Sequence, residues 1–226
     1  MPDPTQPPTS PTTPTTPTAP TLLQLVLIQP SVYVRVFDLD HQAEQFEVFH
    51  KSALTRWAHY AGTEAIVFAF FVAAWSWGDA AAALLGAALV GWYLTMNRVV
   101  GVVAGVVVAV LAVAAQQAQA RFGLTAAHAG VALLALAAIQ NVSHAVEPVP
   151  PTLTGRGFER FPVFWARATT HERLRVLGLN AAYLPLELVS APRLFAVHVL
   201  RALQRCGWRR DWRDDVVRRA DRILRQ

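Results

Sequence analysis

Four long apolar segments follow one another in the middle of the chain and constrain its fold more than any other feature. They cover residues 65–77, 80–96, 99–115 and 124–146. Each is close to the roughly 20 residues that a helix needs to cross a bilayer core, the first of them only if residues 57–63 are included. The breaks between the segments are short, which favours antiparallel neighbours. The sequence therefore predicts an all-α, polytopic membrane bundle of about four transmembrane helices.

Composition divides the 226 residues into four regions. Residues 1–21 are almost wholly Pro and Thr with other polar residues, which predicts a disordered tail. Residues 22–62 are expected to form a cytoplasmic or interfacial segment, and residues 63–147 the transmembrane domain. Residues 148–226 hold an apolar stretch broken by two prolines and end in an arginine-rich helix, so we expect interfacial helices there rather than a fifth span.

Positive charge predicts the orientation of the bundle. Lys51 and Arg56 precede the first apolar segment, Arg98 lies in the second break, and many arginines follow the fourth segment. The positive-inside rule then places both termini in the cytoplasm. The protein is expected to be a multi-pass protein of the inner membrane in a bacterium, or of the endoplasmic reticulum in a eukaryote.

The C-terminal segment interleaves arginines with aspartates between Arg205 and Arg225. This pattern is typical of a solvated helix with i,i+4 ion pairs, and a helix resting on anionic lipid headgroups is the alternative. Nucleic-acid binding is not expected, because these arginines do not belong to a soluble module with interleaved aromatic side chains. The single cysteine, Cys206, excludes an internal disulfide and a zinc site built from several thiolates.

Seven histidines occur, and the predicted topology sorts them. His50 and His59 precede or begin the first crossing and His144 ends the fourth, so an even number of crossings places all three on one membrane face. His128 lies sixteen residues before His144, about 24 Å along a helix, and falls near the opposite face.

His50 and His59 point to opposite sides of a continuous helix, so a helix boundary near residues 52–55 is required if both bind one metal. A surface or packing role is expected for the remaining three: His41, His171 and His198.

The fourth apolar segment ends in polar residues, which are costly in hydrocarbon unless they are paired or face a cavity. Gln140, His144 and Glu147 fall on one helical stripe at i, i+4 and i+7, an arrangement able to orient a metal ligand and its hydrogen-bond partners. A polar helix end that reaches the headgroups is the alternative. For His50 and His59 the matching alternative is an interfacial histidine bound to water or lipid phosphate.

Taken together, the two histidine-bearing stretches resemble the metal-dependent 2-hydroxy fatty acid dioxygenases of fungal phytosphingosine breakdown and their bacterial membrane relatives. That family has a His, an Asn five residues on, a second His four further and then Gly-Thr-Pro, followed later by a Gln, a His four residues on, an acidic residue and a proline. The matching positions here are His50, His59, Gln140 and His144, with Glu147 and Pro151 approximating the acidic and proline positions.

Three departures from that family pattern occur between Glu47 and Pro151, the part of the chain that the resemblance covers. Thr55 stands in place of the Asn, Glu64 follows Gly62-Thr63 in place of the Pro, and Pro-Val-Pro-Pro is not the usual continuation of the second motif.

The resemblance implies a membrane enzyme that uses Fe(II) and oxygen to shorten 2-hydroxy long-chain fatty acids by one carbon. It implies that His50, His59 and His144 bind the iron, with Glu147 as a fourth ligand or a partner of the ligands, and no catalytic residue beyond them. A 2-hydroxy acid chelates iron through its hydroxyl and carboxylate oxygens.

On the substrate side, Gln140 and Thr55 are expected beside the ligands, and Lys51 or Arg56 is expected to pair with the carboxylate. Membrane lipids and a fatty acyl substrate are the expected partners, and the sequence does not indicate an oligomeric state. The leading alternative is a non-catalytic membrane protein whose basic C-terminal helix binds anionic lipid or a protein partner. A haem-binding bundle would need paired histidines at matching depth, and His128 has no such partner in the middle segments.

Overall fold

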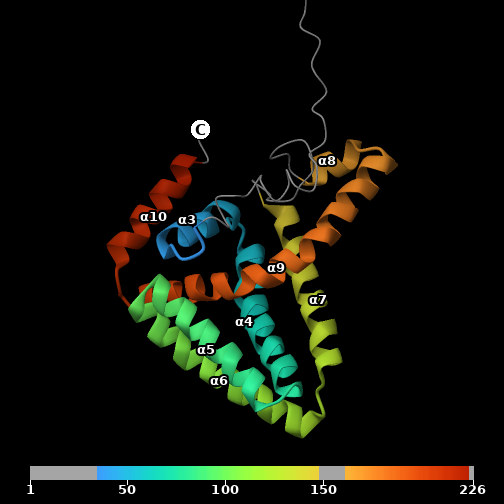
Figure 1. Cartoon of the computed structure of the whole chain (residues 1–226). Coiled ribbons are helices and arrows are strands. Elements are labelled where there is room, and N and C mark those ends of the chain that lie inside the picture. The colour runs from blue at the N-terminus through green and yellow to red at the C-terminus, as the bar shows by residue number, and fades with distance from the viewer. Residues whose placement is uncertain (1–34, 148–160, 224–226) are drawn as a thin grey trace, which may run out of the picture.

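A computed structural model describes residues 35–147 and 161–223, and the described residues form helices joined by short connections (Figure 1). The predictions for residues 1–21 and for Pro151 lie outside them. In chain order the elements are α3 (Leu39–Phe49), α4 (Ala53–Ser76), α5 (Asp79–Met96), α6 (Arg98–Phe122), α7 (Ala126–Ser143), the 3-10 helix η1 (His144–Val146), α8 (Phe161–Arg167), α9 (Thr170–Arg205) and α10 (Arg210–Ile223).

Helices α4 to α7 are each long and apolar enough to cross a membrane, which confirms the all-α bundle with four candidate spans. α4 begins at Ala53, ahead of the expected boundary at residue 63. The Ser52 Oγ caps it by accepting a hydrogen bond from the Thr55 backbone N–H at 3.0 Å. Residues 57–63 therefore belong to this helix and give it the length that a crossing needs.

Close packing joins α5 to α6, and an apolar surface remains outside. A Cβ atom on Gly101 would lie 2.6 Å from backbone atoms of Leu94, so only glycine allows this approach of the two helices. The surface of α6 carries a row of exposed valines at helical spacing: Val99, Val102, Val106, Val110 and Val113. An apolar face of this kind is unfavourable in water and is typical of a helix that contacts lipid.

α9 is one continuous helix although Pro185 and Pro192 lie inside it, so the expectation that the prolines break this stretch is wrong. Each proline removes one backbone hydrogen bond and favours a bend, and α9 changes direction along its course in Figure 1. Every residue from Ser190 to Arg201 is buried. This half of α9 packs against α4, α6 and α7 as well as α3, and that packing offsets the lost hydrogen bonds.

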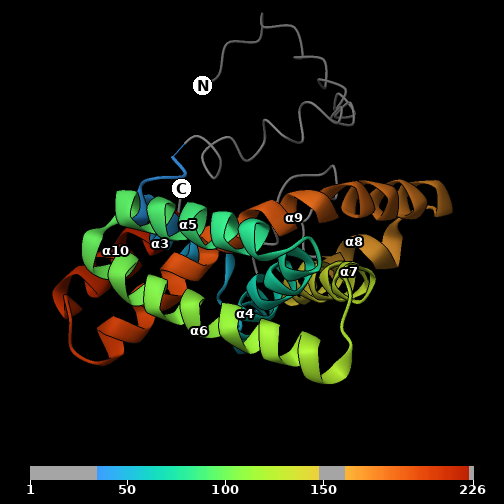
Figure 2. The same ribbon diagram turned by 60° about the horizontal axis from the view of Figure 1, so that its bottom comes forward.

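α10 packs on α3, at the end of the molecule that carries the start of α4 (Figure 2). The Lys51 Nζ lies 2.8 Å from an Asp221 carboxylate oxygen, and the Trp212 Nε1 donates a hydrogen bond to Asp40 at 3.1 Å. A longer contact of 3.7 Å joins Arg219 to Glu44. Part of the charge on the arginine-rich helix is therefore matched within the protein.

Candidate metal centre

Two parts of the chain that are distant in sequence bring His50 and His59 together with His144. α3 ends at Phe49 and α4 begins at Ala53, so His50 lies in the break between two helices while His59 lies in the second turn of α4. The required helix boundary between these two histidines is confirmed. His144 begins η1, where the α-helical winding of α7 tightens.

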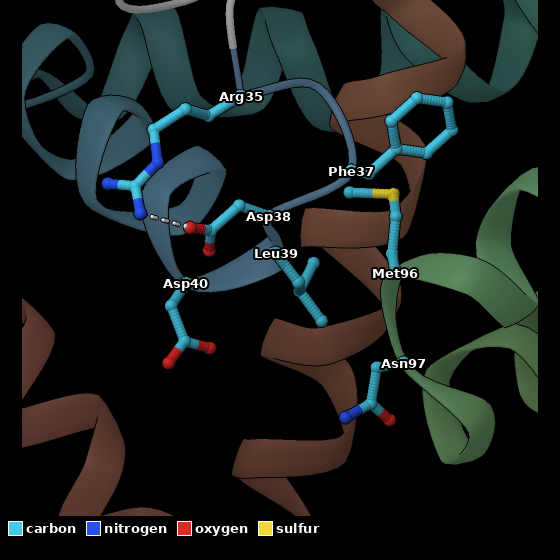
Figure 3. Close-up of a pocket in the computed structure, with 7 residues that line it drawn as sticks. All are labelled: Arg35, Phe37, Asp38, Leu39, Asp40, Met96 and Asn97. Carbon is cyan, nitrogen blue, oxygen red and sulfur yellow. Dashed lines mark ion pairs between the residues drawn. The ribbon is translucent and has the colours of Figure 1, made fainter.

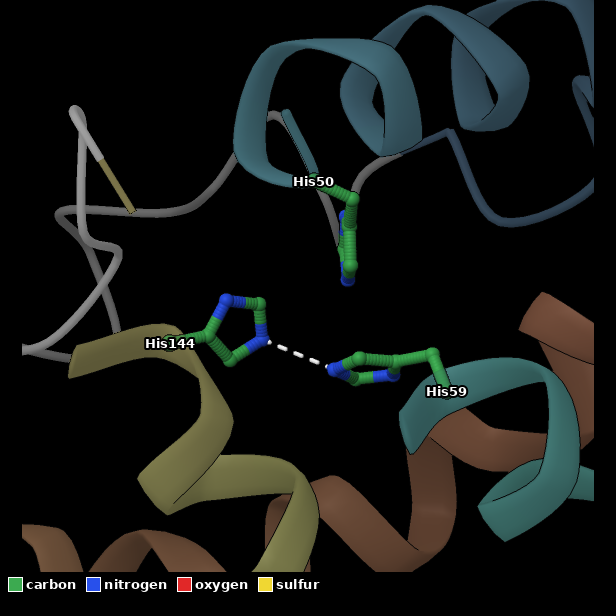
Figure 4. Close-up of side chains that lie close together, drawn as sticks. All are labelled: His50, His59 and His144. Atoms are coloured by element: carbon green, nitrogen blue, oxygen red, sulfur yellow. Dashed lines mark hydrogen bonds between the residues drawn. The ribbon is translucent and has the colours of Figure 1, made fainter. Parts of the chain in front are cut away.

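The rings of His50, His59 and His144 point toward one common position (Figure 4). One candidate ligand atom from each lies within 4.8 Å of the others, and the three residues are only 1–6% exposed. The Nε2 atoms of His59 and His144 are 2.9 Å apart, so the expected convergence of these two rings is confirmed. Two nitrogens bound at right angles to one ion, each at about 2.1 Å, lie about 3.0 Å apart, so this pair fits adjacent positions on a single metal.

Hydrogen bonding prepares His50 to act as a ligand. Its Nδ1 lies 2.9 Å from the Phe46 carbonyl oxygen, which can only accept a hydrogen bond, so Nδ1 carries the proton. The Nε2 is then left with its lone pair, and this atom is buried without a protein partner. A backbone carbonyl that fixes the outer nitrogen is a common support for metal-binding histidine.

Burial keeps the two imidazoles outside the helical spans neutral, as metal binding requires. It lowers the pKa of His50 well below its ordinary value, and positive charge on His59 and His144, and to a smaller extent on His198, would lower it further. For His144, burial lowers the pKa to about 4, although the nearby Glu147 carboxylate acts in the opposite direction. Neutral imidazole is a ligand suited to zinc, copper, iron and nickel, and three such ligands leave positions open for other molecules.

Glu147 is fully buried, but its carboxylate lies against backbone rather than beside the three ligand atoms. One oxygen accepts a hydrogen bond from the Lys51 N–H at 2.8 Å and the other from the Ser52 N–H at 2.9 Å. These amides stand at the start of α4, where the helix dipole favours a negative charge. Glu147 thus connects the segment after His144 to the segment after His50 through these hydrogen bonds. We infer that it helps to position the candidate ligands and is not itself one of them.

Replacing Glu147 by glutamine is expected to weaken metal binding by about 10- to 100-fold, because one of two charge-assisted contacts to the α4 amides is lost. Binding should still reach the wild-type amount of metal at saturation, since the three imidazoles remain. A titration against a competing chelator measures both quantities. Glu44→Gln, which alters the long contact between α3 and Arg219 of α10, is the control. If Glu147→Gln binds less metal than the wild type even at saturation, Glu147 is itself a ligand.

Thr55 and Gln140 lie where α4 packs against the end of α7. The Thr55 hydroxyl donates to the Ser143 carbonyl at 2.8 Å, which adds a second tie beside the one made by Glu147. The Gln140 amide donates to the Thr63 hydroxyl at 3.2 Å, and a Cβ on Gly62 would lie only 2.8 Å from that amide nitrogen. The small residue at position 62 therefore lets Gln140 approach α4.

Lys51 and Arg56, the expected partners of a substrate carboxylate, are both paired with protein carboxylates. Lys51 contacts Asp221, and Arg56 contacts Glu47 at 3.0 Å while its Nε donates to the His50 carbonyl. Glu47 also lies 2.6 Å from Arg201 of α9. These contacts join α3, α4 and α9 around His50, so Arg56 supports the backbone of a candidate ligand.

The remaining histidines lie apart from the three. His128 is exposed at the start of α7 and forms a capping box with Thr125, and His171 is exposed near the start of α9. His198 is buried in α9, and its Nδ1 lies 3.2 Å from a Glu64 carboxylate oxygen. Sequence reasoning missed this pair, although a glutamate inside an apolar span is a signal for it.

A separate pocket of about 490 Å³ lies at the opposite end of α3 from His50 (Figure 3). It is bounded by the start of α3 and by the turn between α5 and α6. The lining residues are Arg35, Phe37, Asp38, Leu39, Asp40, Met96 and Asn97. None of the candidate ligands is among them, so this pocket does not open onto the three histidines.

Comparison with known proteins adds no assignment to this geometry: no protein-family model, no curated protein and no solved structure matches the chain.

Proposed function

We propose that the chain is a membrane-embedded dioxygenase that binds Fe(II) through His50, His59 and His144 and shortens 2-hydroxy long-chain fatty acids by one carbon. The observation that carries this proposal is the buried group of three imidazoles at one end of the candidate spans. The resemblance of the surrounding motifs to 2-hydroxy fatty acid dioxygenases supplies the substrate class.

The donor set fits a metal that must accept further ligands. Three imidazoles leave room for the hydroxyl and carboxylate oxygens of a 2-hydroxy acid and for oxygen. When bound, Fe(II) would hold the acid as a chelate and activate oxygen beside the bond between carbons 1 and 2. Burial of the ligands excludes bulk water from that position.

The overall reaction balances without another reductant. A 2-hydroxy acid and one molecule of oxygen give the acid one carbon shorter, carbon dioxide and water. The bond between carbons 1 and 2 breaks, and the electrons lost by these two carbons reduce the oxygen. The protein's part is to hold the three imidazoles in place through Glu147, Thr55 and Arg56, and to keep the acyl chain in the membrane.

Three phenylalanines of α4, namely Phe68, Phe70 and Phe71, are the candidate contacts for the acyl chain. Phe71 is 1% exposed and belongs to the core, whereas Phe68 is only partly buried and packs at the edge of that core. We therefore assign the acyl-chain contact to the side chains of α4 that are only partly buried.

Orientation belongs to the same proposal, with the histidines at the cytoplasmic face and both termini in the cytoplasm. The charge distribution around Arg98 supports it. Reporter fusions after Asp79 and after Asn97 are expected to report opposite sides of the membrane, with Asn97 cytoplasmic. Two fusions on the same side would contradict the topology.

The non-catalytic alternative relies on a basic C-terminal helix that is free to bind lipid or a partner. The contacts of Lys51 with Asp221 and of Trp212 with Asp40 hold α10 on α3. These contacts favour the enzyme over an adaptor whose function lies in α10.

The deciding experiment uses detergent-purified protein loaded with Fe(II) and incubated with 2-hydroxypalmitate. We expect pentadecanoate and carbon dioxide to appear under air, with neither product formed under argon or by metal-free protein, as measured by mass spectrometry. Palmitate, which lacks the hydroxyl, should remain intact. If 2-hydroxypalmitate also remains intact while a working family member consumes it, the substrate assignment fails and the adaptor alternative takes its place.

A further inference from the structure

Glu64 and His198 form a polar pair that the three-histidine centre does not use, in which the histidine is buried and the carboxylate side chain is 36% exposed. Glu64 lies in the candidate span α4 and His198 in the buried half of α9. The His198 Nδ1 is 3.2 Å from one carboxylate oxygen of Glu64, and the His198 side chain is only 4% exposed. An ionisable pair of this kind at a membrane-spanning helix is costly, so it calls for a functional explanation.

The hydrogen bond to Glu64 leaves the His198 Nε2 able to accept a proton. A carboxylate can only accept, so the imidazole donates from Nδ1 and its Nε2 carries a lone pair. This Nε2 is buried with no protein partner. A carboxylate that holds one ring nitrogen and stabilises the charged ring is the arrangement that makes histidine an effective general base.

His198 packs against two aromatic side chains, Phe46 and Tyr60, that adjoin the candidate ligands. The His198 ring lies 5.5 Å from the Phe46 ring and 4.5 Å from the Tyr60 ring, measured between centroids. Phe46 in turn stacks on His50 at 4.2 Å, and Tyr60 follows His59 in the chain. Further along α9, Arg201 lies about one turn from His198 and contacts Glu47 of α3, and Arg205 lies about two turns away, over the Tyr60 ring.

The proposed reaction needs a base that the centre itself lacks. Chelation through the 2-hydroxyl is strengthened when that hydroxyl loses its proton, and Glu147 is occupied by the α4 amides. The three imidazoles are occupied as ligands. Among the described residues around the centre, His198 combines burial, a carboxylate partner and an open acceptor nitrogen.

We propose that His198, oriented by Glu64, is the proton acceptor of this site and takes the proton of the substrate's 2-hydroxyl, directly or through one water. The hydroxyl O–H bond breaks, an N–H bond forms at Nε2, and the Glu64 carboxylate stabilises the resulting imidazolium. This inference rests on the proposed function, and it extends the site beyond the residues that match the family motifs.

The test compares Fe(II)-loaded wild type with His198→Gln, which keeps a donor and an acceptor but is not basic. We expect an unchanged iron content and a turnover of 2-hydroxypalmitate lowered by about 100-fold or more. In His198→Ala, added imidazole should restore part of the lost rate. His171→Ala, which alters an exposed histidine at the other end of α9, should retain the wild-type rate.

A second readout does not depend on turnover. Under argon, wild type is expected to bind 2-hydroxypalmitate at least about tenfold more tightly than palmitate, and His198→Gln should lose most of this preference. If the wild type consumes 2-hydroxypalmitate and His198→Gln consumes it at the same rate, the inference is wrong and the proposed function stands. Loss of iron from His198→Gln would also overturn it, because His198 would then be a ligand. A wild type that neither binds nor consumes the hydroxy acid would overturn both.

Discussion

Replacing His144 by alanine is expected to lower metal affinity by more than about 100-fold, because loss of a supporting partner alone costs about 10- to 100-fold and this change removes a ligand. His59→Ala should have the same effect, since its Nε2 lies 2.9 Å from that of His144. Both variants should lose the shortening of 2-hydroxypalmitate together with the metal. Metal analysis after gel filtration, with binding titrations, measures the effect.

His128→Ala is the control for both variants, because His128 is exposed near the far end of α7. A thermal melt separates a binding defect from a folding defect. Metal should raise the melting temperature of the wild type and of His128→Ala but not of the two site variants, since a ligand stabilises only a protein that binds it. Metal binding that survives in His144→Ala would remove this residue from the centre.

Replacing Glu47 by alanine is expected to destabilise the protein by about 3–5 kcal/mol, because it leaves the buried Arg201 guanidinium without its carboxylate. The two side chains are 8% and 5% exposed, and the same carboxylate also contacts Arg56. Thermal unfolding in detergent, followed by circular dichroism, measures the loss.

The double variant Glu47→Leu with Arg201→Met should recover most of that stability, because it removes both charges and keeps apolar volume. Asp221→Ala serves as the control. Its contact with Lys51 is partly exposed, so the expected loss is about 1 kcal/mol or less. Equal losses for Glu47→Ala and Asp221→Ala would show that burial of the first ion pair contributes little.

The fold was largely predictable because hydrophobic length is a strong local signal. The four apolar segments gave the four candidate spans, and the even number of crossings correctly placed His59 and His144 together. The helix boundary after His50 was predicted on the condition that His50 and His59 bind one metal, because nine residues place them on opposite sides of a continuous helix. In each case a property of one segment, or a count of segments, was sufficient.

What could not be predicted depends on contacts between distant segments. The position of Glu147 on the Lys51 and Ser52 amides requires the ends of α4 and α7 to meet at a known distance. The pairing of Lys51 with Asp221 requires α10 to pack on α3. The continuity of α9 through its two prolines depends on burial from several sides, which no local pattern reveals.

The central position of α9 has a consequence for how this protein is made. The three candidate ligands precede α9 in the chain, so they are synthesised before the helix that packs against α3, α4 and α7. α3 and α4 therefore gain their packing against α9 only after all four apolar helices have been synthesised. Assembly of the three candidate ligands into one site is thus expected to be complete only after α9 has been synthesised.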